Sequence, residues 1–529
     1  MSRSLVASAI AEAQPRSPML AALTRRIWLP LVIFAAAVVL AVMYHPFALP
    51  EGGDNAIWDY VAQGILRGQM PYRDIIEIKT PAAAYLSALA MATARLFGAD
   101  AVLAVRLLFV LLVGGLCATV YLVGEAYLHN RLAALLACLV PLLAPNLVVM
   151  MISGTRPKVP MLICGMLTFW FIAKARPFWA GFCSMLAFLF WQPGLMFTAA
   201  ALLSFSGYLT SWRDRRALRV LLGALIPLAV MLIYFAMNGA LGDLWAWTIT
   251  YNYAVYYPEG HETPGVALNR LWFLIQQVTD GQTIWVKLGL LGLLWFAAER
   301  IYARLKHSPP ADDLFKEALL VPPLIFLVFC LINYPGADGL IVLLPCAGLF
   351  AACLFAAIHQ WLRSRRFIES RPALVRLVAL VLIAPLAVVV FTAIKRAGAF
   401  QIEEGRTLGD QRREFQKIAE RLGPDDRVYV HGSLEILVLL DRPNMNPYIF
   451  LDRGKDRFLA ARRAGGLEAV LAEMKAAAPK ILALGRLQNV ACRDALIDWA
   501  ESQYELLPLG FAHNSVYVAK TPDAPAAKQ

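Results

Sequence analysis

The sequence predicts an α-helical polytopic membrane protein with a small α/β domain at its C-terminal end. Of the 529 residues, 59% are hydrophobic and 16% are charged, and the mean hydropathy of +0.59 lies well above that of a water-soluble globular domain. Apolar runs of about 17 to 25 residues recur along the chain, each long enough to cross the hydrocarbon core of a bilayer as a helix. Because backbone polar groups in lipid must pair internally, we expect these runs to be helices.

We expect about eleven transmembrane helices, with the N-terminus in the cytoplasm. The polar stretch 1–26 ends in Arg25 and Arg26 and is followed by an apolar run without a small-residue cleavage site, which predicts an uncleaved anchor. The loops then expected on the cytoplasmic side are all basic, so the formal charge of +12 is explained by the positive-inside rule and not by nucleic-acid binding. The least certain boundary lies in 178–211, which could also be one kinked span. The predicted spans are 27–46, 102–124, 132–152, 159–174, 178–193, 195–211, 217–238, 284–303, 317–333, 339–360 and 372–394.

The composition changes near Lys395 to that of a water-soluble domain. Strands are predicted at 427–431, 480–484 and 515–519, alternating with amphipathic helices at 410–422, 467–477 and 493–502. With eleven spans this domain lies outside the cytoplasm. The expected organisation is a cytoplasmic tail (1–26), a transmembrane domain (27–394), an extracytoplasmic α/β domain (395–520) and a disordered tail (521–529) rich in Ala, Pro and Lys.

The first outside loop, 47–101, is too long for a simple turn. Ile57, Tyr60, Val61 and Ile65 recur at helical spacing, which predicts a short amphipathic helix in the membrane interface. Its N-cap would be Asp54 or Asn55, and Asp59 would lie on a solvated face. A second helix is expected to begin at Pro81 and to end near Phe97.

This loop resembles a known family. A Gly-Asp pair after the first span, followed by GQMPYRDIIEIKTPAAAYL, is similar to the GDxxxY…G..PYRDxxxxKPP…Y pattern of GT-C glycosyltransferases. The relatives are the protein O-mannosyltransferase-like enzymes, which include the lipid A aminoarabinose transferase and bacterial galacturonosyltransferases. The motif likeness covers 51–97 and, more loosely, SGTRPKVP at 153–160 and WQPG at 191–194.

The resemblance implies a bacterial inner-membrane enzyme that takes a sugar from a polyprenyl phosphate. The sugar would pass to an envelope acceptor, such as lipid A or lipopolysaccharide, another glycan or a protein, on the periplasmic face. By position, Asp54 matches the carboxylate that acts as general base, and Lys79 matches the lysine that contacts the lipid phosphate. The candidate substrate- and phosphate-binding residues are Lys79, Arg73, Glu77, Tyr85, Arg156 and Lys158.

Two departures from the family pattern leave a divergent acceptor or an inactive relative open. The family's KPP is here Lys79-Thr80-Pro81, and Asn55 stands where some members carry a second acid. No aspartate-rich cluster requires a metal, no metal ligands are assigned, and the need for a divalent ion stays open. The chain carries no nucleotide-binding motif, which fits a lipid-linked donor.

The chemistry of sugar transfer requires similar residue types independently of the resemblance. A base must take the proton of the acceptor hydroxyl, and a carboxylate near a membrane surface can have a raised pKa suited to that task. Cations must stabilise the charge that develops on the leaving phosphate, and Lys79, Arg73 and either Arg156 or Lys158 are available.

Each candidate also has a simpler structural explanation. Asp54 can act as a helix cap alone, and Lys79 can snorkel or pair with Glu77. Asp74 and Glu77 are expected to be partners of Arg73 and Lys79. Arg156 and Lys158 can mark a polar turn, and the intramembrane Arg106 can snorkel or serve a function.

The sequence also allows other interpretations of its loops and of its function. The aromatic stretch LWAWTITYNYAVYY, 244–257, can form an interfacial belt or stack on a sugar. Glu259, His261 and Glu262 beside it are too loosely spaced to indicate a metal site. The alternative functions are a transporter or flippase and a non-catalytic protein of envelope assembly.

Overall fold

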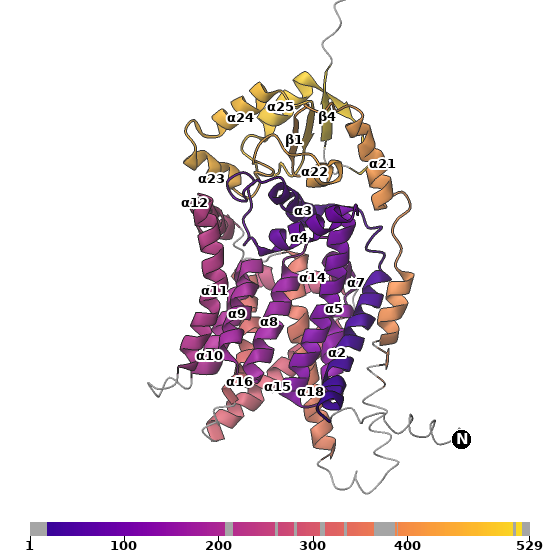
Figure 1. Ribbon diagram of the computed structural model, residues 1–529, viewed down its shortest axis with the longest axis vertical. Coiled ribbons are helices and arrows are strands. Elements are labelled where there is room, and N and C mark those ends of the chain that lie inside the picture. Colours follow the sequence, from indigo (N-terminus) through magenta and orange to yellow (C-terminus); the bar gives the residue numbers. More distant parts are fainter. Residues whose placement is uncertain are drawn as a thin grey trace, which may run out of the picture.

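The structure is a computed structural model, and it describes residues 18–206, 215–259, 263–279, 283–306, 313–332, 336–363, 390–511 and 515–520, with 384, 387 and 388. Apolar helices form a bundle, and the C-terminal α/β part covers one end of it (Figure 1). Two helices of the first loop, α3 and α4, lie between these layers. The tail 521–529 and the cluster formed by His261 and Glu262 lie outside the described residues.

Four helical runs in the described part of the chain are long and apolar enough to cross a membrane. They are Ala101–Leu128, Arg216–Met237, Phe315–Ile332 and Ala337–Trp361, and four shorter apolar helices accompany them. The exact number of spans therefore remains a prediction. The helices of the bundle are α2 (Pro18–Val42), α5 (Ala101–Leu128), α6 (Arg131–Leu139), η1 (Val140–Leu142), α7 (Pro145–Ile152), α8 (Lys158–Ala173), α9 (Pro177–Phe190), η2 (Gln192–Gly194), α10 (Leu195–Ser206), α11 (Arg216–Met237), α14 (Pro264–Val278), α15 (Ile284–Lys306), α16 (Asp313–Glu317), η5 (Ala318–Leu320), α17 (Val321–Ile332), η6 (Ala337–Val342) and α18 (Leu343–Arg363).

One predicted span is interrupted, and two neighbouring predicted spans are separated as expected. The span expected at 132–152 bends by 74° between Arg131–Leu142 and Pro145–Ile152, at a break that holds no helix. The stretch 178–211 is not one kinked helix, because the short turn η2 after Trp191 separates α9 from α10. Most of the span expected at 372–394 lies outside the described residues.

Small residues allow the helices of the bundle to approach one another closely. A Cβ atom at Gly181 on α9 would collide with the carbonyl of Val220 on α11, and one at Gly223 would collide with that of Phe178. Gly292 on α15 meets the Phe350 carbonyl of α18 in the same way. Such close contacts favour helix association in lipid, where hydrophobicity alone does not hold helices together.

The first loop folds into α3 (Gly53–Leu66) and α4 (Ala82–Leu96). The predicted N-cap was wrong, because Gly52 caps α3 without a side-chain hydrogen bond and Asp54 lies in the first turn. The prediction for α4 was confirmed, since Pro81 is its N-cap. Most of α3 is buried and packs against α4 and the C-terminal domain, and its position in the membrane interface stays a prediction.

The C-terminal domain contains a four-stranded sheet in the order β1-β2-β4-β3. The first two strands are parallel, and the other neighbours are antiparallel. Three strands lie where the sequence predicted them, whereas β3 was not predicted. The elements are α21 (Leu408–Ala419), β1 (Val428–His431), α22 (Leu434–Leu440), α23 (Lys455–Arg462), α24 (Gly466–Ala477), β2 (Ile481–Leu484), α25 (Arg493–Gln503), β3 (Tyr504–Leu507) and β4 (Ser515–Ala519).

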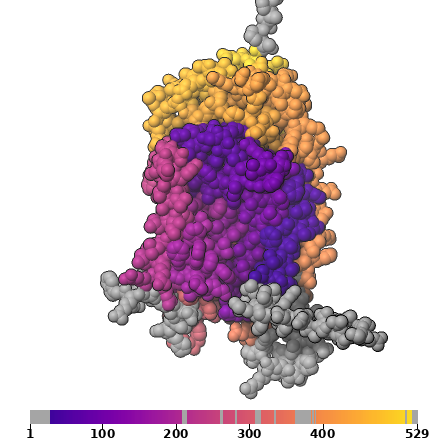
Figure 2. Space-filling view, in the orientation of Figure 1, coloured from indigo at the N-terminus to yellow at the C-terminus, as the bar shows by residue number. Residues whose placement is uncertain are grey.

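The space-filling view shows this domain seated directly on the first loop (Figure 2). The Gln63 side chain on α3 donates a hydrogen bond to the Val438 carbonyl of α22, at 2.9 Å. The Tyr60 hydroxyl accepts one from the backbone N–H of Asn444, at 2.8 Å. The domain and the loop therefore share buried polar contacts, and any cavity between them has walls from both.

Candidate active site

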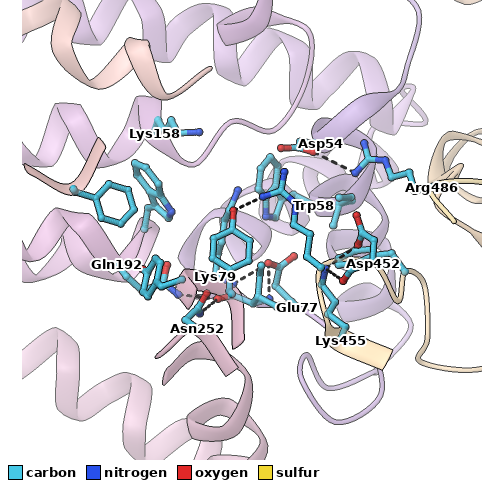
Figure 3. A pocket seen from close by; sticks show the side chains of 18 residues that line it. Asp54, Trp58, Glu77, Lys79, Lys158, Gln192, Asn252, Asp452, Lys455 and Arg486 are labelled. Carbon is cyan, nitrogen blue, oxygen red and sulfur yellow. Dashed lines mark hydrogen bonds and ion pairs between the residues drawn. The ribbon is translucent and has the colours of Figure 1, made fainter. Parts of the chain in front are cut away.

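A cavity of about 150 Å³ lies where the first loop, the ends of the bundle helices and the C-terminal domain meet (Figure 3). It is lined by acidic, basic and aromatic side chains from all three parts of the structure. They are Asp54, Ile57, Trp58, Glu77, Ile78, Lys79, Lys158, Trp191, Gln192, Asn252, Tyr256, Tyr257, Phe329, Phe450, Asp452, Arg453, Lys455 and Arg486.

Asp54 lies in the first turn of α3, with a carboxylate oxygen 3.5 Å from Arg486. Its side chain is 40% exposed, so a substrate can reach the carboxylate. Burial raises the pKa of Asp54, but the positive charges of Lys79, Arg156 and Arg486 outweigh burial and hold that pKa below its usual value. The expectation of a raised pKa was therefore wrong, and Asp54 is ionised and ready to accept a proton at neutral pH.

The Lys79 ammonium lies 4.2 Å from the centre of the Trp58 ring, a cation–π contact within the cavity wall. Contrary to the expectation, Lys79 does not form an ion pair with Glu77, and within the described residues it forms no ion pair. Instead Glu77 Oε1 accepts the backbone N–H groups of Ile78 and Lys79, at 2.8 and 2.9 Å. The Lys79 charge therefore remains available to a ligand.

The backbone around Lys79 is fixed from several sides. The Ile78 carbonyl accepts one hydrogen bond from Gln192 at 2.8 Å and another from Asn252 at 2.9 Å. The Thr80 hydroxyl donates to the Phe188 carbonyl on α9, also at 2.8 Å. Thr80, which replaces the family's first proline, thus anchors the lysine through a hydrogen bond that proline could not make.

A second group of cations lies beside the first. Lys158, the first residue of α8, contacts the Asp338 carboxylate and sits 4.8 Å from the Trp191 ring centre. Arg156 shares the same carboxylate at 3.3 Å and lies 5.9 Å from the Trp58 ring, although it does not line the cavity. One carboxylate therefore serves two cations. Asp338 could not be predicted as their partner, because it comes from a distant segment of the chain.

The aromatic stretch 244–257 has some side chains that are exposed and others that line the cavity. It forms the irregular helices α12 (Leu241–Trp245), η3 (Ala246–Thr250), η4 (Asn252–Tyr256) and α13 (Tyr257–Glu259), of which η3 and η4 are π-helical. Trp245 and Tyr253 are exposed. Asn252, Tyr256 and Tyr257 line the cavity. Wide π-helical turns occur frequently at functional sites.

The C-terminal domain forms the opposite wall. Lys455 pairs with Asp452 at 2.9 Å, and Arg453 donates to the Tyr256 hydroxyl at 2.7 Å. The sequence analysis missed these residues and Arg486, because it found nothing in this domain beyond its fold. The one local signal is Gly454 directly after Arg453, which is typical of a tight left-handed turn.

His431 holds the two turns of this wall in place. Its Nε2 accepts the backbone N–H of Leu451 at 2.8 Å, and its Nδ1 contacts the Gly485 carbonyl. Leu451 precedes Asp452 and Arg453, and Gly485 precedes Arg486. These bonds give His431 a structural role, and burial lowers the pKa of His431 to about 4.

Two further predicted binding residues, besides Arg156, do not line the cavity. Arg73 is half-exposed, pairs with Asp74 at 2.9 Å as expected, and donates to the Asn238 carbonyl. Its proposed contact with a phosphate is therefore not supported. The Tyr85 hydroxyl donates to that of Tyr234 at 3.1 Å, away from the cavity lining.

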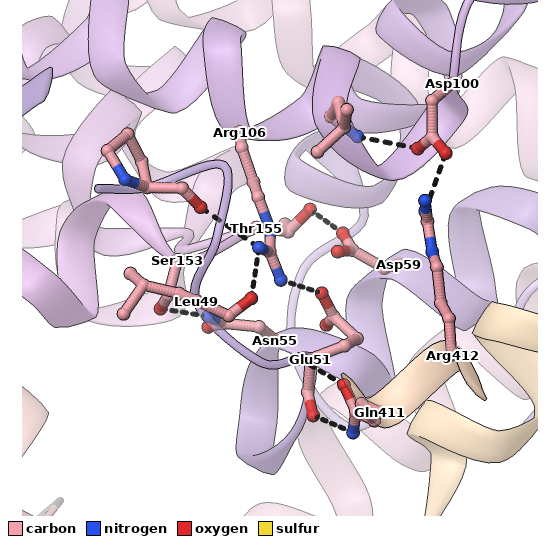
Figure 4. A network of polar contacts seen from close by, with 12 residues as sticks. Leu49, Glu51, Asn55, Asp59, Asp100, Arg106, Ser153, Thr155, Gln411 and Arg412 are labelled. Carbon is pink, nitrogen blue, oxygen red and sulfur yellow. Dashed lines mark hydrogen bonds and ion pairs between the residues drawn. The ribbon is translucent and has the colours of Figure 1, made fainter. Parts of the chain in front are cut away.

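A buried polar network lies behind α3 (Figure 4). Arg106 is fully buried and pairs with Glu51 at 3.0 Å, so it does not snorkel to the interface. Asp59 is also fully buried and accepts a hydrogen bond from Thr155, so the expectation of a solvated face was wrong. Asn55 donates to the Ser153 hydroxyl at 2.6 Å. These bonds tie α3 to the second outside loop and to α5.

No group of three potential ligands among His, Cys, Asp and Glu is placed to hold a metal ion within the described residues. The arrangement is therefore a set of three carboxyl groups, those of Asp54, Glu77 and Asp452, and several cations around an aromatic-walled cavity at the end of an apolar bundle. Such a site can take a proton from a hydroxyl and can bind a phosphate.

The helical bundle and the C-terminal domain together have the GT-C fold of membrane proteins. The chain is similar to ArnT, a lipid A aminoarabinose transferase, from Cupriavidus metallidurans bound to undecaprenyl phosphate, with a TM-score of 0.58 and 12% identity over 93% of this chain and 97% of that one. The apo form of that protein matches with the same TM-score and identity, over 93% and 98% of the two chains. The apo oligosaccharyltransferase from Archaeoglobus fulgidus matches with a TM-score of 0.51 and 13% identity, over 94% of this chain and 75% of that chain.

No family model and no curated protein matches the sequence. The structural matches cover nearly the whole chain, so the GT-C fold expected from the first-loop motif is confirmed.

Proposed function

We propose that this protein is a membrane glycosyltransferase that moves a sugar from a polyprenyl phosphate to a hydroxyl of an envelope acceptor. The observation that carries the proposal is the meeting of Asp54 with Lys79 and Lys158 in one aromatic-walled cavity. The likeness to a protein that binds undecaprenyl phosphate supports a lipid-linked donor. We further propose that the cavity faces the periplasm, with the protein in the bacterial inner membrane.

In the proposed reaction, Asp54 takes the proton of the acceptor hydroxyl as its oxygen bonds to the anomeric carbon of the sugar. The bond between that carbon and the phosphate oxygen breaks, and its electron pair stays on the phosphate. Lys79 and Lys158 stabilise the charge that appears there. Each step uses groups of the chain and of the two substrates.

The low pKa of Asp54 shapes this mechanism. An ionised carboxylate with a depressed pKa is always ready to accept a proton but is a weak base. Asp54 therefore takes the proton most readily at a late stage of the transfer, when the bond between the sugar and the phosphate is largely broken and the hydroxyl of the acceptor has become acidic. The nearby Arg486 also orients the carboxylate at 3.5 Å.

The aromatic walls suit both parts of the donor. Trp58, Tyr256 and Tyr257 offer faces on which a sugar ring can stack. Phe329 lies 5.8 Å from Tyr257 between ring centres and continues the apolar wall toward α17. A prenyl chain can approach the cavity along that side.

The proposal is tested with purified protein, a panel of radiolabelled polyprenyl phosphate sugars and an envelope extract. We expect transfer by the wild type and a loss of at least about a hundredfold in Asp54→Asn, because general-base catalysis contributes about 10²–10⁴-fold. Asp441→Asn is the matched control, since Asp441 is exposed, lies in a left-handed turn that asparagine tolerates, and is not part of the cavity.

Undiminished transfer by folded Asp54→Asn would exclude Asp54 as the base. Absence of transfer with every donor, from wild-type protein that retains its thermal transition, would contradict the proposed function itself.

A further inference from the structure

The charges around the cavity do not balance. Glu77 lies near Lys79 without an ion pair between the two side chains, Asp452 pairs with Lys455, and Asp54 pairs with Arg486. In number, these three carboxyl groups offset these three cations. Two positive charges remain when each carboxyl is counted as ionised. One comes from Arg156 and Lys158, which share the single carboxylate of Asp338, and the other is Arg453.

Arg453 forms no ion pair within the described residues. Its guanidinium donates to the Tyr256 hydroxyl at 2.7 Å and lies 5.3 Å from that ring's centre. Its backbone carbonyl accepts the Tyr251 hydroxyl, also at 2.7 Å. Two tyrosines of the irregular helix thus hold the residue at the cavity wall and leave its charge without a carboxylate.

The backbone at Arg453 is strained. Its φ is 55°, in the left-handed region that non-glycine residues rarely occupy, and Arg486 has a φ of 49°. Such a conformation costs about 1 kcal/mol or more and is enriched at functional sites. Both arginines that the C-terminal domain presents to the cavity are therefore held in unfavourable turns.

The proposed reaction creates a charge that these surplus cations match. The donor is a phosphodiester with one negative charge, whereas the leaving phosphate is a monoester with a second pKa of about 6 and nearly two negative charges above that pH. Once Asp54 has lost the proton that it took from the acceptor, the cavity again has two surplus positive charges. These equal in number the two negative charges of the monoester. When the singly charged diester is bound, it balances only one of the two surplus positive charges.

We propose that Arg453 is the group that binds the second negative charge on the leaving phosphate. The inference rests on the proposed function. An interaction made with the leaving phosphate and not with the donor lowers the barrier to transfer without tightening donor binding. The C-terminal domain thereby supplies part of the leaving-group site, and Lys79 and Lys158 bind the charge that donor and product share.

The test compares the binding of two soluble probes, farnesyl phosphate and its methyl ester, to the full chain in detergent at pH 8. We expect the wild type to bind the monoester at least about tenfold more tightly than the diester. In Arg453→Asn this preference should fall by roughly tenfold or more, because a charge-assisted hydrogen bond is lost. Binding of the methyl ester should change little.

Two features of the variant separate a binding role from a structural one. Asparagine tolerates the left-handed region, so Arg453→Asn keeps the turn, and its thermal transition should not fall. Arg453→Lys keeps the charge and should restore part of the preference. Arg493→Gln, an exposed arginine on α25 outside the cavity, is the control and should bind both probes as the wild type does.

An equal loss of affinity for both probes would overturn the proposal, because Arg453 would then contact the phosphate uniformly. An unchanged preference would also overturn it and would point to an acidic group on the sugar or acceptor as the Arg453 ligand. If the folded wild type binds neither probe, the proposed function fails and not the role of Arg453 alone.

Discussion

The ion pair between Arg106 and Glu51 joins the first loop to the bundle through side chains that are both fully buried. Arg106 also donates to the carbonyls of Pro46, at 3.0 Å, and of Leu49. A single guanidinium therefore satisfies three acceptors at the point where the chain leaves the first apolar helix. Its role is to fix the start of α3, and through α3 the position of Asp54.

Removing one member of this pair leaves a buried charge without a partner. We expect Arg106→Met to lower the free energy of unfolding by about 3–5 kcal/mol, the usual cost of breaking a buried pair from one side. The double variant Glu51→Met/Arg106→Met should recover part of this loss. Recovery would be incomplete, because the Pro46 and Leu49 carbonyls remain unpaired. Thermal unfolding in detergent measures the stability of the single and the double variant. A double variant less stable than Arg106→Met would contradict the interpretation of Arg106 and Glu51 as a buried pair.

At the scale of elements, β1 positions the C-terminal wall of the cavity through one imidazole. His431 is the last residue of β1, and its two ring nitrogens bond to the segments that lead to Arg453 and Arg486. Nε2 accepts one hydrogen bond and Nδ1 donates the other, so the two bonds can exist together only when the ring is neutral. Protonation of Nε2 would break the bond from Leu451 and loosen the turn that carries Arg453.

Stability should therefore depend on pH through His431. Its pKa is lowered from 6.5 to about 4 by burial, so the unfolded chain binds the proton more readily. The stabilisation is fully present above pH 6.5 and is lost as the pH falls toward 4, by about 2 kcal/mol between pH 7.5 and 5. His431→Gln, which can also accept and donate, should remove this part of the pH dependence. Equal pH profiles for the two proteins would contradict the role of His431.

Much of the element order could be predicted from the sequence, because hydropathy and helix-capping residues are local signals. Pro81 marked the start of α4, and the alternation near 427–431 marked β1. The burial of Asp59 could not be predicted in this way, since its partner Thr155 lies on another loop. In an isolated helix the side chain of Asp59 would be exposed to solvent. It is enclosed once α3 packs against its neighbours.

The same limit applies to the site. Asp54, Lys79 and Lys158 could be found from the first-loop motif and from cations on an outside loop. Arg453 and Arg486 could not, because they reach the cavity only when the C-terminal domain packs on the first loop. A left-handed Arg-Gly turn is a weak signal by itself. Asp338, Asn252 and Gln192 likewise acquire their roles only from tertiary contacts.

At the scale of the whole molecule, the two layers make the orientation in the membrane testable. The C-terminal domain covers the cavity at one end of the bundle, and the end of α15 lies at the other (Figure 1). If eleven spans and a cytoplasmic N-terminus are correct, Ser502 lies outside and Leu305 lies in the cytoplasm. Both side chains are exposed, and Leu305 is 82% exposed.

Cysteine labelling distinguishes the two sides. Seven of the eight native cysteines are buried and Cys164 is partly buried, so their reaction with a polar, membrane-impermeant maleimide should be slow. In intact spheroplasts we expect Ser502→Cys to react and Leu305→Cys to react only after lysis, because the reagent cannot cross the bilayer. The unsubstituted chain is the control for background. The reverse pattern would place the cavity in the cytoplasm, where Asp54 would meet cytoplasmic acceptors. It would require either an N-terminus outside the cytoplasm or an odd change in the number of spans before Leu305.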